Sequence, residues 1–216
     1  TVGGGIIVDP HPARRHKRMR PEVIQRLETL AFGTPAELLV ERLQAGEPCT
    51  SQELSARSTL TKDETAAALG EALRKEDILV LAASFIPGQD IELSPATYLI
   101  SRGGWATLKG RIEELLSSHH QRYPLRQGMP REELKSRLQL PVKSFNPLAA
   151  YAESAGLFRE VNGFVQLPAF SVAFSEKQQQ RIDQALAQFR RQPYTPPAIA
   201  EIHSLLDEEL LNACFE

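Results

Sequence analysis

The chain has 216 residues, of which 24% are charged and 42% hydrophobic, and its formal net charge is −2 at pH 7. This composition is typical of a soluble globular protein, and the balanced charge excludes polyanion binding through bulk positive charge. The sequence contains no apolar run of about 18 residues, so we expect no membrane span. Cys49 and Cys214 are far apart and form no CxxC pair, which predicts free thiols in a reducing, cytoplasmic compartment.

The chain opens with TVGGGIIVDPHPARRHKRMR. Its β-branched residues predict a strand over residues 1–8, which Pro10 and Pro12 end because proline cannot donate to a β-ladder. The glycines do not indicate a phosphate-binding loop, since Gly5 is followed by two isoleucines instead of Lys and Ser or Thr.

A basic segment follows this predicted strand. Its cations are Arg14, Arg15, Lys17, Arg18 and Arg20. Two interpretations remain open: the segment contacts RNA phosphates, or it is a solvated linker between domains.

Helical apolar spacing begins at residue 21, where proline suits a first helical position. Three capping boxes then mark three short helices in succession. The pairs are Thr34 with Glu37, Thr50 with Glu53, and Thr61 with Glu64. Residues 78–100 follow and predict two strands around a Pro87-Gly88 turn.

The same order recurs further along the chain. Trp105, Leu108, Ile112, Leu115 and Leu116 predict one face of a helix. A short second helix is expected to begin near Pro130. A third helix is expected to end near Gly156, which would cap it. Its buried face is expected to hold Leu148, Tyr151, Ala152 and Ala155. Asn162-Gly163 then predicts a tight type I′ hairpin.

A third round begins at Ser175, which can form a box with Gln178. One helix face is expected to hold Ile182, Ala185, Leu186 and Phe189. A short helix is expected over 196–203, and LLDEELLNACFE predicts the start of another.

Three helices followed by a hairpin is the order of a winged helix. The fold class is therefore predicted to be mostly α with small β-hairpins (α+β), as tandem winged-helix domains. The expected divisions are a last barrel strand and basic linker (1–20), a first winged helix with a leading helix (21–103), a second winged helix (104–172) and a truncated third (173–216).

The charges of the predicted third helices argue against groove binding. A winged helix that reads DNA normally places Lys and Arg on this helix. Residues 61–77 are instead acidic, and VKSFNPLAAYAESAG is nearly neutral. The sequence shows no carboxylate pair, nucleophile–base pair or metal cluster, so we expect no catalytic, cofactor or metal site. Tyr123-Pro124-Leu125-Arg126 is interpreted as a connector instead of a ligand motif.

Three stretches carry a family resemblance. TVGGGIIVDPHPARRHKR resembles the exit from the third domain, a β-barrel, of the selenocysteine-specific elongation factors (SelB). HHQRYPLRQGMPREELKSRL is similar to the second winged helix of the SelB C-terminal region, and FSVAFSEKQQQRI is similar to the entry into the third. The resemblance covers nearly the whole chain.

The resemblance implies a role in translation. SelB proteins carry selenocysteinyl-tRNA to the ribosome and hydrolyse GTP in an N-terminal domain. Four C-terminal winged helices recognise an mRNA hairpin, mainly through the last one. We therefore expect a cytoplasmic, monomeric fragment of a parent GTPase that binds GTP and Mg²⁺ elsewhere. Its modules would space the tRNA-binding body from the hairpin-binding tip. The alternatives are a DNA-binding transcription regulator and a protein–protein adaptor.

Overall fold

The computed structural model describes residue 4 and residues 20–82, 93–191, 194–195 and 197–215. These residues are mostly helical, with two small antiparallel sheets. They form two compact units. One comprises the described residues of Thr1–Leu108 together with Pro141–Tyr151, and the other comprises Lys109–Leu140 and Ala152–Glu216. The predicted barrel strand lies outside the described residues except for Gly4, and the module boundaries remain a prediction.

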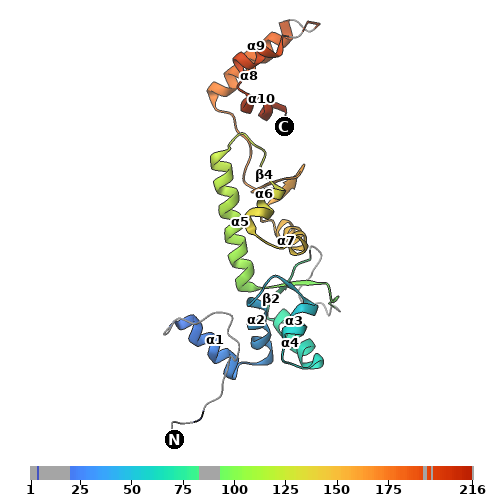
Figure 1. Ribbon diagram of the computed structural model, residues 1–216. Helices are drawn as coiled ribbons and strands as arrows, with labels where there is room; N and C mark the ends of the chain where they lie inside the picture. Colours follow the sequence, from blue (N-terminus) through green and yellow to red (C-terminus); the bar gives the residue numbers. More distant parts are fainter. Residues whose placement is uncertain (1–3, 5–19, 83–92, 192–193, 196, 216) are drawn as a thin grey trace. The chain divides into compact units, whose positions relative to one another are not determined.

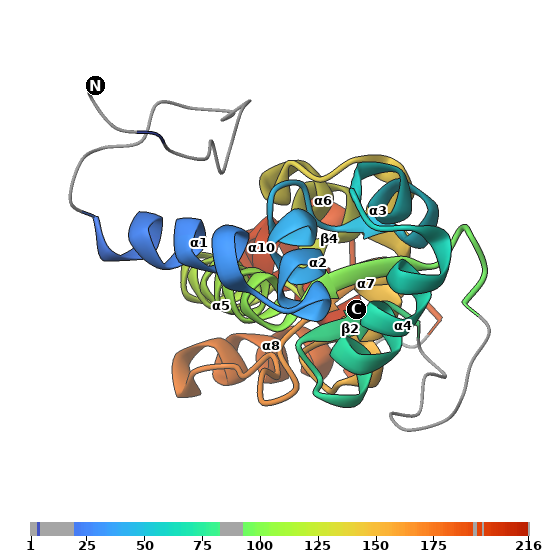
Figure 2. The ribbon, with the colours of Figure 1, turned by 90° about the horizontal axis from the view of Figure 1, so that it is seen from below.

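The first unit begins with α1 (Pro21–Phe32), which has proline at its first position as predicted. It lies beside α2 (Pro35–Gln44), as Figure 2 shows. Helices α3 (Ser51–Arg57) and α4 (Lys62–Arg74) follow, and α2, α3 and α4 lie together (Figure 1). All three predicted capping boxes are confirmed. Each threonine side chain accepts a hydrogen bond from the backbone N–H of the glutamate three residues on, and each glutamate side chain accepts one from the backbone N–H of the threonine.

The sheet of this unit has three strands where the sequence predicted two. The strands β2 (Ile78–Val80) and β3 (Tyr98–Ser101) form the expected antiparallel pair, and the predicted Pro87-Gly88 turn between them lies outside the described residues. A third strand, β1 (Cys49–Thr50), pairs with the other edge of β3, so the order is β1-β3-β2. Two residues carry no visible alternation of apolar and polar side chains, which is why this strand escaped prediction.

The core of the first unit gathers the buried faces of α2, α3, α4 and the sheet. Its fully buried side chains include Leu39, Leu43, Leu54, Ala72, Ile78 and Leu99. Leu38, on the same helix as Leu39 and Leu43, is half-buried.

The second round begins with α5 (Arg102–Arg122), which buries Ile112 and Leu116 as predicted. It is followed by α6 (Arg131–Leu138), next to Pro130, and by α7 (Val142–Ser154). Gly156 ends the last of these at φ 70°, and the Leu157 N–H bonds back to the Ala152 carbonyl. This is the predicted glycine cap.

The second sheet also has three strands. Here β5 (Arg159–Val161) and β6 (Phe164–Gln166) are joined by Asn162 and Gly163, both with positive φ (51° and 80°), which confirms the type I′ turn. The unpredicted β4 (Met129–Pro130) pairs with β6, giving the order β4-β6-β5.

The third round contains α8 (Glu176–Arg191), α9 (Ile199–Leu205) and α10 (Glu208–Phe215), all in the second unit. Ile182 and Ala185 are buried as predicted, in a cluster with Ile202, Leu206 and Leu210.

The predicted inward positions were wrong at three places. Leu186 and Phe189 are 46% and 42% exposed, and neither belongs to the hydrophobic cluster that covers Ile182 and Ala185. Ala155 is exposed because α7 ends before it.

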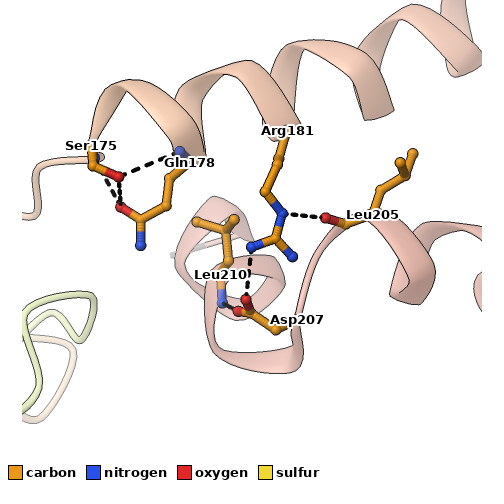
Figure 3. A network of polar contacts seen from close by, with 6 residues as sticks. All are labelled: Ser175, Gln178, Arg181, Leu205, Asp207 and Leu210. Carbon is orange, nitrogen blue, oxygen red and sulfur yellow. Dashed lines mark hydrogen bonds and ion pairs between the residues drawn. The ribbon is translucent and has the colours of Figure 1, made fainter.

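The third round is held together by hydrogen bonds between its helices (Figure 3). Ser175 and Gln178 form the predicted box at the start of α8. Further along this helix, Arg181 donates from Nε to the Leu205 carbonyl at 2.6 Å and from Nη1 to the Asp207 carboxylate at 3.0 Å. The same carboxylate caps α10 by accepting from the Leu210 N–H at 2.9 Å.

Candidate nucleic-acid interface

Most of the predicted RNA-contact residues cannot be located. Arg14, Arg15, Lys17 and Arg18 lie outside the described residues, and Arg20 is exposed immediately before α1. The prediction that this basic segment touches RNA therefore stays a prediction, and an interface must be sought among the other cations.

Two cations next to the C-terminal end of α4 have carboxylate partners. Lys75 forms an ion pair with Glu71 at 2.7 Å, and this contact lowers the pKa of the Glu71 carboxyl. Arg102 contacts Glu76 at 3.2 Å and donates to two backbone carbonyls. The capping bond to the Thr61 backbone lowers the pKa of Glu64. The N-terminal end of α4 therefore remains anionic.

The second module is neutralised in a similar way at α6 and at the hairpin. Each cation of α6 has a carboxylate partner: Arg131 pairs with Glu160, Lys135 with Glu132, and Arg137 with Glu133. The hairpin cation Arg159 donates to the Pro168 carbonyl at 2.6 Å. A phosphate would have to compete with these existing partners.

Two histidines are buried near the end of α5. His120 stacks on Phe170 with ring centroids 3.7 Å apart, and its Nε2 accepts from the Leu167 N–H at 3.2 Å. Burial lowers the pKa of both His119 and His120. Nδ1 of each ring has no hydrogen-bond partner within the described part of the chain. These features indicate neutral rings, of which His120 anchors the segment 167–170 against α5.

A different arrangement occurs where α5 ends. The guanidinium carbons of Arg122 and Arg126 lie 5.4 Å and 4.1 Å from the centre of the Tyr123 ring. Neither arginine forms an ion pair with any carboxylate that the structure describes. This segment is a connector after the end of a helix, as predicted, since α5 ends at Arg122. The prediction did not include the cluster, although RYPLR shows two arginines beside a tyrosine.

This arginine–tyrosine cluster lines an open pocket of about 680 Å³. Leu125 and Phe164 contribute apolar surface, and α10 contributes the carboxylates of Glu208 and Glu209 together with Asn212 and Ala213. The pocket lies within the second unit. The pocket lining therefore has a cationic wall from the end of α5, an anionic wall from α10, and apolar side chains as well.

The comparisons with known proteins agree with the family resemblance. Residues 114–167 match the family model described as "Elongation factor SelB, winged helix". This match supports the expected likeness to the SelB C-terminal winged-helix region at its second module. No curated protein matches the chain. No helix among the described residues is both long and apolar enough to cross a membrane.

Proposed function

We propose that this chain is part of a selenocysteine-specific elongation factor and acts in selenocysteine incorporation in the cytoplasm. The match of residues 114–167 to the SelB winged helix carries the proposal. The two rounds of three helices with a small sheet, and the three further helices after them, support it. The parent protein would supply the GTPase and tRNA-binding functions and would meet the mRNA hairpin and the ribosome as partners.

Within that protein, the first two modules would act as spacers between the tRNA-carrying body and the hairpin-binding tip. The supporting observations are the acidic balance of α4, whose three carboxylates outnumber its two cations, and the carboxylate partners of the cations of α6. Binding to a nucleic-acid groove needs several free cations, each of which releases counterions from a phosphate. The helix α7 carries one cation, Lys143, and one carboxylate, Glu153, so it adds no positive face.

The spacer role predicts weak and unspecific binding of the cognate mRNA hairpin by this chain. We would titrate the labelled hairpin, with a hairpin of scrambled loop sequence as control, at several salt concentrations. Micromolar or weaker affinity with little difference between the two hairpins is expected. Nanomolar affinity that is lost with the scrambled loop would refute the spacer role.

The same titration with duplex DNA addresses the DNA-binding alternative. A regulator that enters the major groove would show a steep fall of affinity with salt, with a logarithmic slope of about −0.9 per neutralised phosphate. The acidic first turn of α4, which contains Asp63 and Glu64, predicts that no such slope will be found.

A further inference from the structure

We propose that the pocket between the end of α5 and the start of α10 binds one unpaired guanine nucleotide of RNA. The inference goes beyond the spacer role, because it assigns a ligand to a site that no module needs for spacing. The choice of RNA over DNA rests on the proposed function, whereas the choice of a guanine nucleotide rests on the residues of the pocket.

The cationic wall suits the phosphate group of a nucleotide. A guanidinium group that stacks on an aromatic ring keeps its N–H edge free to donate to phosphate oxygens. Arg126 lies 4.1 Å from the centre of the Tyr123 ring, and Arg122 lies 5.4 Å from it. The tyrosine thus holds two guanidinium groups close together at the pocket, and no described carboxylate forms an ion pair with either.

The anionic wall selects among the bases. Guanine presents two adjacent donors, N1–H and the N2 amino group, on its Watson–Crick edge, and a carboxylate offers two acceptor oxygens to match them. Adenine places an acceptor at N1 and would be repelled there. Glu208 and Glu209 are exposed in the first turn of α10, and neither forms an ion pair with a described cation.

The apolar part of the pocket suits the face of a base. Leu125 is buried, Phe164 is half-buried, and both line the space together with Ala213. Bases of single-stranded RNA bind to proteins largely by stacking on such surfaces. The volume of about 680 Å³ falls within the usual range of small-ligand pockets.

The mixed charge excludes simpler ligands. A free phosphate would face the repulsion of two carboxylates, and a cationic side chain would face that of two guanidinium groups. A guanine nucleotide carries its negative charge at one end and its hydrogen-bond donors at the other, so it satisfies both walls at once.

The test is a titration of the complete chain with fluorescein-labelled oligouridylates of about seven nucleotides that carry one central guanine or adenine. Fluorescence anisotropy at low salt measures the two dissociation constants. Guanine is expected to bind about tenfold or more tightly than adenine. Equal affinities, or no binding of either oligonucleotide, would overturn the proposal.

Two double variants test which part of the nucleotide each wall of the pocket binds. Glu208→Gln with Glu209→Gln is expected to bring the ratio of the guanine and adenine affinities close to one, since an amide keeps one acceptor oxygen and replaces the other with an N–H donor. Arg122→Gln with Arg126→Gln should weaken both oligonucleotides about tenfold and leave their ratio unchanged. The matched control is Glu201→Gln in the first turn of α9, which lies outside the pocket lining and should change neither constant.

Circular dichroism of each variant shows whether the fold is retained. The four substituted side chains of the pocket are exposed, so loss of folding is not expected. A guanine preference that survives the loss of both carboxylates would overturn the assignment of the anionic wall.

Discussion

Replacing Gly104 by alanine is expected to destabilise the first unit, although alanine is the better helix former. Gly104 lies in the first turn of α5, where its N–H donates to the Ser101 hydroxyl oxygen at 2.9 Å. A Cβ atom at this position would lie 2.0 Å from Oε1 of Glu47. That distance is far inside van der Waals contact, so the glutamate side chain would have to move.

The glutamate cannot move without cost. Its carboxylate accepts from the Ser101 N–H at 2.6 Å and from the Ser101 hydroxyl at 3.0 Å. Ser101 is only 1% exposed, so water cannot replace either bond. Each hydrogen bond to a charged group contributes about 1.5–3 kcal/mol, whereas Ala gains at most about 1 kcal/mol over Gly in a helix. Loss of both bonds therefore predicts a net loss of about 2–5 kcal/mol of unfolding free energy.

Urea denaturation followed by circular dichroism measures this loss, and amide exchange of the Ser101 N–H localises it. Gly70→Ala is the matched control in the same unit. No atom lies within 4 Å of its added Cβ, so it should stabilise by up to about 1 kcal/mol. In a Glu47→Ala background, Gly104→Ala should cost nothing further. An equal cost in both backgrounds would show that the carboxylate contact is not the cause.

Three further predictions concern the second unit. Arg181→Ala and Asp207→Ala should each lower its stability by about 1 kcal/mol, as loss of a helix cap does, and the double variant should cost less than the sum in a denaturation cycle. Burial lowers the pKa of His119 and His120, so the folded state binds fewer protons than the unfolded state. Stability contributed by these rings should be complete above about pH 6.5 and fall as the pH drops below it. A double His→Gln variant that loses as much stability between pH 7.5 and 5.5 as the parent would contradict this. Gly163→Ala should cost about 1 kcal/mol in thermal unfolding, because φ is 80° there, and an unchanged midpoint would count against strain at the turn.

The features that were predicted correctly depend mostly on interactions between residues that are close together in the sequence. A capping box such as Thr50 with Glu53 closes within four residues, and the Asn162-Gly163 turn is determined by two, so both can be recognised without tertiary information. The two-residue strands β1 and β4 carry no pattern of their own and form only because a longer strand lies beside them.

The pocket could not be predicted for a similar reason. Its cationic wall ends α5 and its anionic wall begins α10, which are separated by about eighty residues of sequence. Helical spacing shows which residues share one face of a helix. It does not show which helices meet, so the combination of Arg126 with Glu208 became visible only in the folded chain.

The central strand β3 determines when the first unit can fold during synthesis on the ribosome. Leu99 pairs with Cys49 on one side and with Val80 on the other, so the first sheet cannot close until synthesis has passed that residue. The capping boxes of α2, α3 and α4 need only neighbouring residues, which are synthesised earlier. Helices this short are marginally stable alone, so they gain full stability only when β3 completes the sheet and the core.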